Sequence, residues 1–255
     1  MIKTTDDAGI RSILMERPPS NVLSLDLMGA LSEAFKDAAG DPGVRCVLLG
    51  SALPKYFSAG LDLDEIMSLP QKRRLEPFRT VFSVHRQLAG LPKPTIAVID
   101  GTALLGGWIV AMGCDFRWMC SEKGRIALSE VRLGLSPTSP LISRLCAMSK
   151  DPTLVKELVL QGRTLKSEQA LRGGFVDRLA PSAELMSEAM REARSLAKLA
   201  PKAYAAVKRD LNAANGLDDD SVWDKALEGF RGLLDADEAR EGLTAQHEKR
   251  KPRWD

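Results

Sequence analysis

Two glycine-bearing segments and one isolated carboxylate carry the residue types best suited to chemistry. The first segment spans residues 57–63, and the second places Gly106-Gly107 shortly after the β-branched run Thr95–Ile99. A glycine pair between a strand and a helix lets a ligand approach the backbone, and the first N–H groups of a helix have no intrahelical partner. Glu130 ends a further apolar run. Backbone donors for a developing negative charge, together with one carboxylate in apolar surroundings, predict a proton-transfer site.

The composition is typical of an ordinary folded domain. The chain has 255 residues, of which 44% are hydrophobic and 27% charged, and its formal net charge is +2. This length allows one large core, or a core with an appendage. The near balance of charge argues against nucleic-acid binding. No apolar run approaches the roughly 20 residues that cross a bilayer, and residues 1–10 lack the apolar segment of a signal peptide, so we expect no membrane partner and no targeting segment.

The scarcity of histidine limits the available metal and nucleophile chemistry. His85 and His247 are the only histidines, and neither has a cysteine or an acid at metal-ligand spacing. We therefore expect no metal, and a Ser-His or Cys-His nucleophile is poorly supplied. The four cysteines form no C-x-x-C pair. This favours a reducing compartment, the cytoplasm if the protein is bacterial or alternatively the mitochondrial matrix.

The hydrophobic patterns predict an α/β core followed by helices. Up to residue 181, short apolar runs alternate with helical periodicity, with strands expected at 11–15, 44–49, 95–99 and 114–119 and helices at 25–39, 71–91, 140–148, 152–161 and 164–171. Four helical patterns follow with no strand among them, at 183–199, 202–212, 221–234 and 236–247. We therefore predict an α/β domain over residues 1–198 and an all-helical section over residues 199–255.

Several motifs, spaced in order along the chain, are typical of one family. They are Phe57-Ser58-Ala59-Gly60-Leu61-Asp62-Leu63, Gly106-Gly107 followed by Cys114-Asp115-Phe116-Arg117, Leu133-Gly134-Leu135-Ser136-Pro137, and Glu241-Gly242. Together they resemble the crotonase (enoyl-CoA hydratase/isomerase) superfamily. The resemblance implies a spiral of β-β-α units, an acyl-CoA thioester substrate, and no cofactor besides the coenzyme A of the substrate itself. It also implies that residues 199–255 serve assembly into a homotrimer or a dimer of trimers.

For the site, the resemblance implies a thioester oxygen held by two backbone N–H groups while an enolate forms. By position, these N–H groups belong to Leu61 and Gly106, and Glu130 is the catalytic residue. The positions that match substrate-binding residues of the family are Ala59, Gly60, Asp62, Leu63 and Ser129. Asp62 is also explained as a helix cap, and Ser129 as an ordinary hydroxyl at the end of a strand.

One departure from the family pattern bears on the reaction. Hydratases of the family use two glutamates, and the position of the first is occupied here by Ile109. Adding water requires one group to deprotonate the water and another to manage the proton at C2, whereas moving a double bond requires one base. The chain is therefore most similar to the mitochondrial-type Δ3,Δ2-enoyl-CoA isomerases, in which a single glutamate at the Glu130 position acts. An apolar pocket would raise the pKa of Glu130 toward working pH.

Alternative functions remain open at this point. A hydratase, or another crotonase chemistry, could take a second acid from Asp64 or Glu65. A non-catalytic acyl-CoA-binding subunit would keep the fold and leave Glu130 unused. A serine or cysteine hydrolase is disfavoured, since both histidines lie outside the motifs. Cations for the coenzyme A phosphates could come from Arg17, Lys55 or Lys93.

Overall fold

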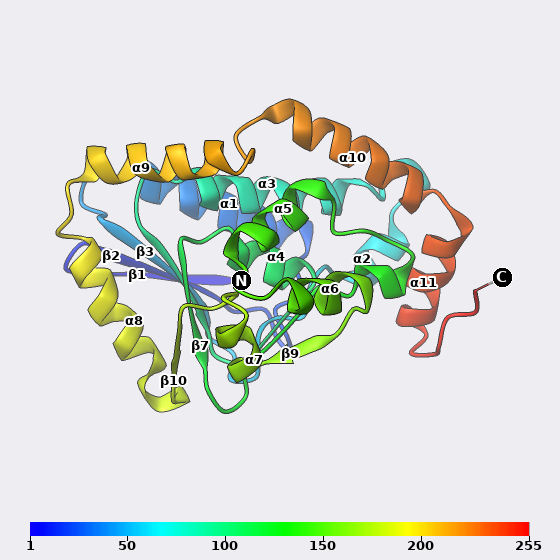
Figure 1. The fold of residues 1–255 in the computed structure, drawn as a ribbon, viewed down its shortest axis with the longest axis horizontal. Coiled ribbons are helices and arrows are strands. Elements are labelled where there is room, and N and C mark those ends of the chain that lie inside the picture. Colours follow the sequence, from blue (N-terminus) through cyan, green and yellow to red (C-terminus); the bar gives the residue numbers. More distant parts are fainter. Residues whose placement is uncertain (255) are drawn as a thin grey trace.

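The computed structural model describes residues 1–254, whose strands form two sheets (Figure 1). The larger sheet has the strand order β1 (Ile2–Asp7), β2 (Ile10–Met15), β3 (Cys46–Ser51), β5 (Thr95–Ile99), β7 (Phe116–Cys120) and β10 (Arg178–Ala180). The smaller sheet has the order β4 (Tyr56–Ser58), β6 (Thr102–Leu104), β8 (Arg125–Ala127) and β9 (Thr164–Lys166). The pairs β1–β2 and β8–β9 are antiparallel, and the pairings between the other neighbours are parallel.

Helices cover both faces of the larger sheet. Along β3, Cys46 and Leu48 face α8 (Ser182–Leu196), whereas Val47 and Leu49 face the main core, which includes α1 (Leu25–Gly40) and α3 (Glu76–Gly90). All four side chains are fully buried. In Figure 1, α1 and α3 lie above the sheet and α8 lies below it. A continuous apolar run covered on both faces is typical of a central parallel strand.

From β3 to β8, consecutive strands alternate between the two sheets. β3 leads to β4, β5 to β6 and β7 to β8, and helices follow each pair: α2 (Leu63–Ser68) and α3, then α4 (Gly106–Met112), then α5 (Ser139–Met148) and α6 (Pro152–Leu160). The chain thus repeats a β-β-α unit that advances along both sheets. This arrangement confirms the predicted α/β spiral.

Several elements differ from the sequence-based predictions. The helix predicted over 164–171 begins too early, because Thr164–Lys166 forms β9, in which Leu165 pairs with Ile126 of β8, and the helix α7 spans Ser167–Arg172. The helix predicted over 71–91 is interrupted: a 3-10 turn, η1 (Gln71–Arg73), precedes α3, which has Pro77 in its first turn. Strand β1 was not expected, since it is mostly polar and lies at the edge of the sheet.

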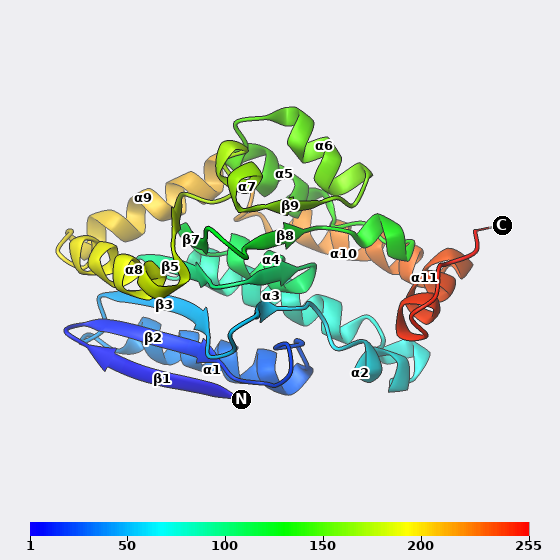
Figure 2. The same cartoon turned by 90° about the horizontal axis from the view of Figure 1, so that it is seen from below.

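The C-terminal helices pack on the α/β part of the chain. α9 (Pro201–Ala214) contacts α3, and α10 (Asp220–Leu234) contacts α5. α11 (Asp237–His247) contacts α2 (Leu63–Ser68) and the 3-10 turn η2 (Glu130–Leu133). Figure 2 shows α10 and α11 extending to the end of the molecule at which α2 lies. Phe230 and Leu243 belong to the main core cluster, so the helices after residue 199 share a core with the α/β part. The last strand, β10, ends at Ala180, and the division of the chain at residue 198 stays a prediction.

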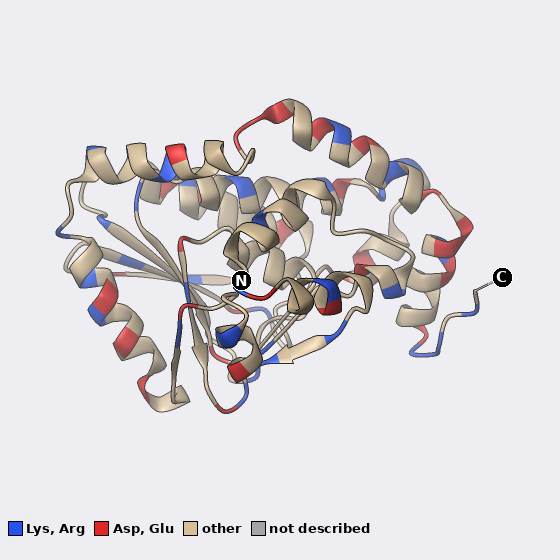
Figure 3. Cartoon of the chain, in the orientation of Figure 1, with Lys and Arg blue, Asp and Glu red and all other residues tan. Residues whose placement is uncertain are grey.

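Charged side chains of both signs alternate along the outer helices (Figure 3). Over the described residues, the longest helices carry too many of them, and are too short, for any to cross a bilayer. No group of histidine, cysteine, aspartate and glutamate side chains in that part of the chain is arranged to hold a metal ion.

Candidate active site

A cavity of about 930 Å³ is enclosed by α2, α3, α4, η2, α10 and α11. Its mouth is polar, with the exposed side chains of Asp64 and Lys249. Its interior is apolar, with the buried side chains of Phe78, Phe82 and Phe230. A cavity with a polar mouth and an apolar interior suits a ligand with one charged end and one apolar end.

Glu130 is the carboxylate of this cavity that lies in apolar surroundings. It is 7% exposed, and its Oε2 atom is buried without a hydrogen-bond partner among the described residues. Burial disfavours the charged form and raises the pKa of Glu130 from 4.5 to about 8. A carboxyl group with this pKa can accept and return a proton near neutral pH, as a general base that later acts as an acid must do.

The turn that carries Glu130 is held in place by its own backbone and by α11. The N–H of Leu135 donates to the Glu130 carbonyl at 3.0 Å, and Gly134 ends η2 in the left-handed conformation, with φ of 69°. Gly242 of α11 lies so close to this turn that a Cβ atom there would be 2.5 Å from the Leu133 carbonyl. A side chain at Gly242 would therefore displace either the helix or the turn, so the close approach depends on glycine.

Two backbone segments meet at the start of α4. The N–H of Leu23 donates to the Gly60 carbonyl at 2.7 Å, and the N–H of Asp62 donates to the Leu23 carbonyl at 3.1 Å. This bridge leaves the Leu61 N–H without an acceptor among residues 1–254. A Cβ built on Gly106 would lie 3.4 Å from the Leu61 nitrogen, which shows how closely the two segments approach.

Within residues 1–254, neither Leu61 nor Gly106 donates its backbone N–H to another protein group. Both residues line the cavity, which also contains Glu130. Leu105 precedes Gly106 with φ of 48°, an uncommon value for a residue other than glycine. This conformation turns the chain from β6 into α4 and brings the Gly106 N–H to the cavity, so two free donors and one carboxylate share one space.

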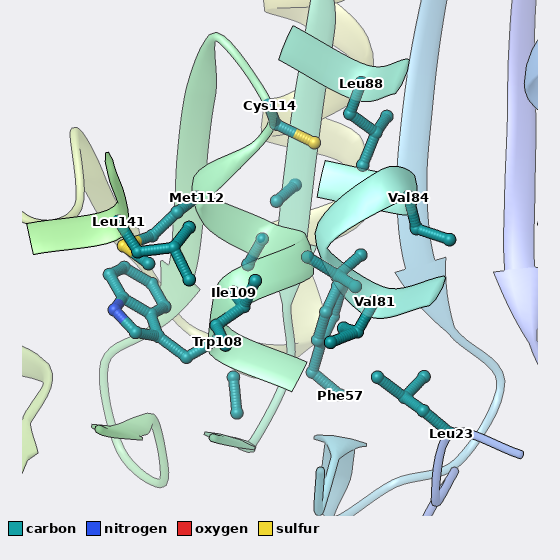
Figure 4. Close-up of a cluster of buried hydrophobic side chains, with 14 of the residues drawn as sticks. Leu23, Phe57, Val81, Val84, Leu88, Trp108, Ile109, Met112, Cys114 and Leu141 are labelled. Atoms are coloured by element: carbon teal, nitrogen blue, oxygen red, sulfur yellow. The ribbon is translucent and has the colours of Figure 1, made fainter. Parts of the chain in front are cut away.

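Ile109, one turn into α4, contributes an apolar wall to the same cavity. It is 4% exposed, and its carbonyl oxygen lies 2.8 Å from Nδ1 of the fully buried His85. Burial lowers the pKa of His85 to about 4, so the ring is neutral at working pH and Nδ1–H is the donor in this contact. Figure 4 shows Trp108 beside Leu141 and Met112, on the other side of α4 from Val81.

The other carboxylates near the cavity are engaged elsewhere. Asp62 caps α2 by accepting from the N–H of Glu65, and it pairs with Arg17 at 2.6 Å. Glu65 accepts from the backbone N–H of Leu25. Asp64 lies at the mouth, where it is 3.1 Å from Nε2 of His247. Glu130 alone among these carboxylates combines burial with an oxygen that lacks a partner among the described residues.

Comparison with known proteins places the chain in a family. The family model described as enoyl-CoA hydratase/isomerase matches residues 5–255. The chain belongs to the enoyl-CoA hydratase/isomerase family. A curated relative, carnitinyl-CoA dehydratase from Salmonella typhi, is 32% identical over 98% of this chain and 96% of its own length. As a member of this family, the protein is an acyl-CoA-processing enzyme.

Solved structures of the family have the same fold. Human mitochondrial Δ3-Δ2-enoyl-CoA isomerase matches with a TM-score of 0.91 and 24% identity, covering 97% of both chains. An enoyl-CoA hydratase from Mycobacterium avium subsp. paratuberculosis matches with a TM-score of 0.84 and 26% identity, covering 100% of this chain and 98% of its own. Because an isomerase and a hydratase both superpose well, the fold itself does not select between the two reactions.

The structure brings together most of the residues that the sequence singled out in this family member. The cavity is lined by Ala59, Leu61, Asp62, Leu63, Gly106 and Glu130. Gly60 and Ser129 are not part of its lining; the Gly60 carbonyl joins the bridge to Leu23, and the Ser129 carbonyl accepts from the N–H of Arg132. Both lie next to lining residues, and their roles toward substrate stay predictions.

Among the cations considered for the phosphates, Arg17 lines the cavity although its guanidinium also binds Asp62. Lys55 is exposed outside the lining, and Lys93 donates to the carbonyls of Ala38 and Asp41 at the end of α1. Lys249, which the sequence did not single out, lies at the mouth.

Sequence reasoning missed the part of the lining that comes from the C-terminal helices. Phe230, Leu243, Gln246 and Lys249 all line the cavity. Their helices showed ordinary amphipathic periodicity, which indicates that one face is buried but not what it is buried against. No local signal could have placed them at the site.

Proposed function

We propose that the protein is an enoyl-CoA isomerase that moves a double bond from C3 to C2 of an acyl-CoA thioester. The observation that carries this proposal is the single unpartnered carboxylate of Glu130 in a cavity that also contains two free backbone N–H groups. Ile109 occupies the position at which a hydratase of the family has its other glutamate. One base and one oxyanion site are sufficient for a double-bond shift.

The reaction assigns each group one task. The thioester oxygen accepts from the N–H groups of Leu61 and Gly106, and the Glu130 carboxylate removes a proton from C2. The electron pair of that C–H bond forms the C1–C2 double bond of a dienolate, and negative charge moves to the thioester oxygen. The protonated Glu130 then returns the proton to C4 of the dienolate. As it does so, the carbonyl of the thioester re-forms and the remaining double bond lies between C2 and C3.

Fixed donors suit the charge that develops in this scheme. Backbone N–H groups aimed at the thioester oxygen need little reorganisation as charge accumulates, and one such donor contributes about 3–4 kcal/mol in other enzymes. The apolar side chain of Ile109 in the cavity wall keeps water away from the dienolate and strengthens the same interactions. Burial of Glu130 in this cavity also raises the pKa of its carboxyl group.

The second candidate is addition or removal of water, which the carnitinyl-CoA dehydratase relatives favour. This chemistry needs a second group to hold and activate the water. Asp64 also lines the cavity, but its side chain is 87% exposed and lies against His247. A dehydratase would have to bring this carboxylate from the mouth into the interior.

Two assays separate the candidates. We expect wild-type protein to convert a 3-enoyl-CoA to the 2-enoyl-CoA, followed by its ultraviolet absorbance, and to hydrate crotonyl-CoA slowly. Glu130→Gln should abolish the isomerisation, while Glu184→Gln on the exposed surface of α8 serves as the matched control. Hydration as fast as isomerisation would favour the second candidate. Acyl-CoA binding without turnover in either assay, unchanged in Glu130→Gln, would indicate a non-catalytic acyl-CoA-binding subunit.

Assembly and location complete the proposal. We propose a homotrimer or a dimer of trimers, supported by the exposed apolar side chains of Val207 and Leu211 on the outer face of α9. Sedimentation equilibrium measures the mass of the assembly. We also propose a reducing cytoplasm, supported by the bacterial origin of the curated relatives and by the buried free thiols of Cys46, Cys114 and Cys120.

A further inference from the structure

The interior of the cavity has a defined apolar end, which bears on the acyl chain. This step rests on the proposed function, in which the charged coenzyme A occupies the polar mouth. The apolar acyl chain must then enter the interior lined by Ile66, Phe78, Val81, Phe82 and Phe230, since burial of its methylene groups drives binding.

A row of aromatic rings from α3 and α10 closes this end. The ring of Phe230 lies 4.8 Å from that of Phe78, and it meets Phe82 edge-on with the ring centroids 5.8 Å apart. Behind them, Trp223 lies 6.3 Å from Phe82 between ring centroids. These distances are those of aromatic rings in direct contact, so the row is packed.

Trp223 packs against Phe82 and is itself held by two further contacts. Its indole N–H donates to the Leu217 carbonyl at 3.0 Å, and the Arg86 guanidinium lies 5.4 Å from its ring. A second cavity of about 540 Å³ begins on its far side. Phe82 lines the first cavity and Trp223 lines the second, so this ring pair stands between the two spaces.

We propose that Phe82, held by Trp223, sets the upper limit on the length of the acyl chain. The substrate is then an acyl-CoA whose chain is aliphatic and uncharged and ends before this ring pair. A charged chain terminus is disfavoured, because the lining side chains at this end are hydrocarbon and a charge there would lose its water without gaining a partner. The rings also pack directly against one another, in tilted and edge-on contacts, which leaves no open aromatic cage for a quaternary ammonium group.

Binding of saturated acyl-CoAs tests this inference without relying on turnover. We expect the affinity of wild-type protein to rise about fourfold per methylene from butanoyl-CoA upward, and to fall once the chain exceeds the limit. Phe82→Leu should move this limit to a longer chain, and Phe82→Ala should move it further. Phe35→Leu on α1 is the matched control, because Phe35 is also buried, at 1% exposed against 6% for Phe82, and does not line the cavity.

Three outcomes would overturn the inference. The limit could stay in place in a folded Phe82→Leu protein, or move equally in Phe35→Leu. Alternatively, an acyl-CoA ending in a trimethylammonium group could bind more tightly than its uncharged analogue of equal length. Each leaves the proposed isomerase standing if the acyl-CoAs bind and 3-enoyl-CoA is converted. Failure of every acyl-CoA to bind would instead contradict the proposed function itself. Circular dichroism of each variant confirms that it is folded before binding is measured.

Discussion

The α/β part of the chain and the C-terminal helices contribute to the same cavity in different ways. The α/β part supplies the groups that bear charge in the proposed reaction: the Glu130 carboxylate and the backbone N–H groups of Leu61 and Gly106. The C-terminal helices supply mainly shape, through Phe230 on α10 and the close approach of Gly242 on α11. The groups proposed to react thus all come from the α/β part, whereas the apolar end of the cavity is shared between Phe78 and Phe82 on α3 and Phe230 on α10.

This division has a physical reason. Parallel strands and the turns that leave them fix backbone positions closely, because their hydrogen bonds link segments remote in sequence. Helices packed by apolar side chains can exchange one hydrocarbon group for another at modest cost. Changes at the strand-to-helix turns of the α/β part should therefore affect the rate of reaction. Changes at the contact between the rings of α3 and α10 should affect substrate choice, and changes in α11 should affect the placement of Glu130.

The largest effect is expected at Glu130 itself. Glu130→Gln should lower the isomerisation rate by about 10²–10⁴-fold, the usual contribution of a positioned general base. In wild type, kcat/KM should rise with pH through a midpoint near 8, because the carboxylate form is the active one. A pH–rate profile measures both. A midpoint near 4.5 would show that Glu130 is well solvated in solution.

The raised pKa of Glu130 should also make stability depend on pH. Stability should fall over the pH range in which kcat/KM rises, and Glu130→Gln should remove this dependence. The pKa of Glu130 is raised in the folded state, so the folded protein holds a proton that the unfolded chain has released between pH 4.5 and 8. Wild-type stability should therefore fall as pH rises through this window. Glu130→Gln cannot lose that proton, and its melting temperature should exceed that of wild type above pH 8 and approach it near pH 4.5. Calorimetry across this range measures the difference.

The next largest effect tests the α/β part without touching a side chain that reacts. A Cβ atom at Gly107 would lie 2.6 Å from the Ser58 carbonyl oxygen, which itself precedes the Ala59-Gly60 segment. Gly107→Ala should push the start of α4 away from Leu61 and cost about 1–3 kcal/mol of stability, with a loss of kcat. Gly29→Ala on α1 is the control, since no atom lies within 4 Å of its added Cβ. It should stabilise the protein by about 0.5–1 kcal/mol.

Gly242 gives the corresponding test in the C-terminal helices. Gly242→Ala should separate α11 from the turn that holds Glu130, because the added Cβ would overlap the Leu133 backbone. We expect kcat to fall by less than in Gly107→Ala, and the pKa in the rate profile to move toward the ordinary carboxyl value as water reaches Glu130. Gly229→Ala, on α10 with no atom near its added Cβ, is the matched control. Equal profiles in the two variants would contradict a role for α11 in seating Glu130.

The smallest effect is expected at the mouth. Asp64→Asn removes an exposed ion pair to His247, which should cost less than about 1 kcal/mol of stability and leave isomerisation nearly unchanged. Kinetics with a 3-enoyl-CoA and with crotonyl-CoA, measured side by side, check this expectation. If Asp64→Asn lost most of its hydration rate but kept its isomerisation rate, Asp64 would serve as a second acid. The reacting groups would then not be confined to the interior of the cavity.

The sequence by itself, through the motifs it shares with the family, was enough to predict the spiral α/β fold and the residues proposed to react. The motif from Phe57 to Leu63, the Gly106-Gly107 pair and Glu130 were found because each belongs to a short pattern of neighbouring residues, which is local information. Ile109 was equally readable, because a missing carboxylate is visible in the sequence alone.

Only the tertiary structure decided what surrounds those groups. Phe230 and Leu243 look like ordinary buried positions of amphipathic helices. The contact of Phe230 with Phe78 depends on how α10 folds back over α3, and Leu243 reaches the cavity because α11 packs against α2 and η2. The short strand β9 was mistaken for helix for the same reason, since Leu165 is held by its pairing with Ile126 rather than by its neighbours in sequence. The raised pKa of Glu130 likewise comes from burial by remote segments. Local sequence patterns predict which face of a helix or strand is buried, but the residues packed against that face are decided by the tertiary structure.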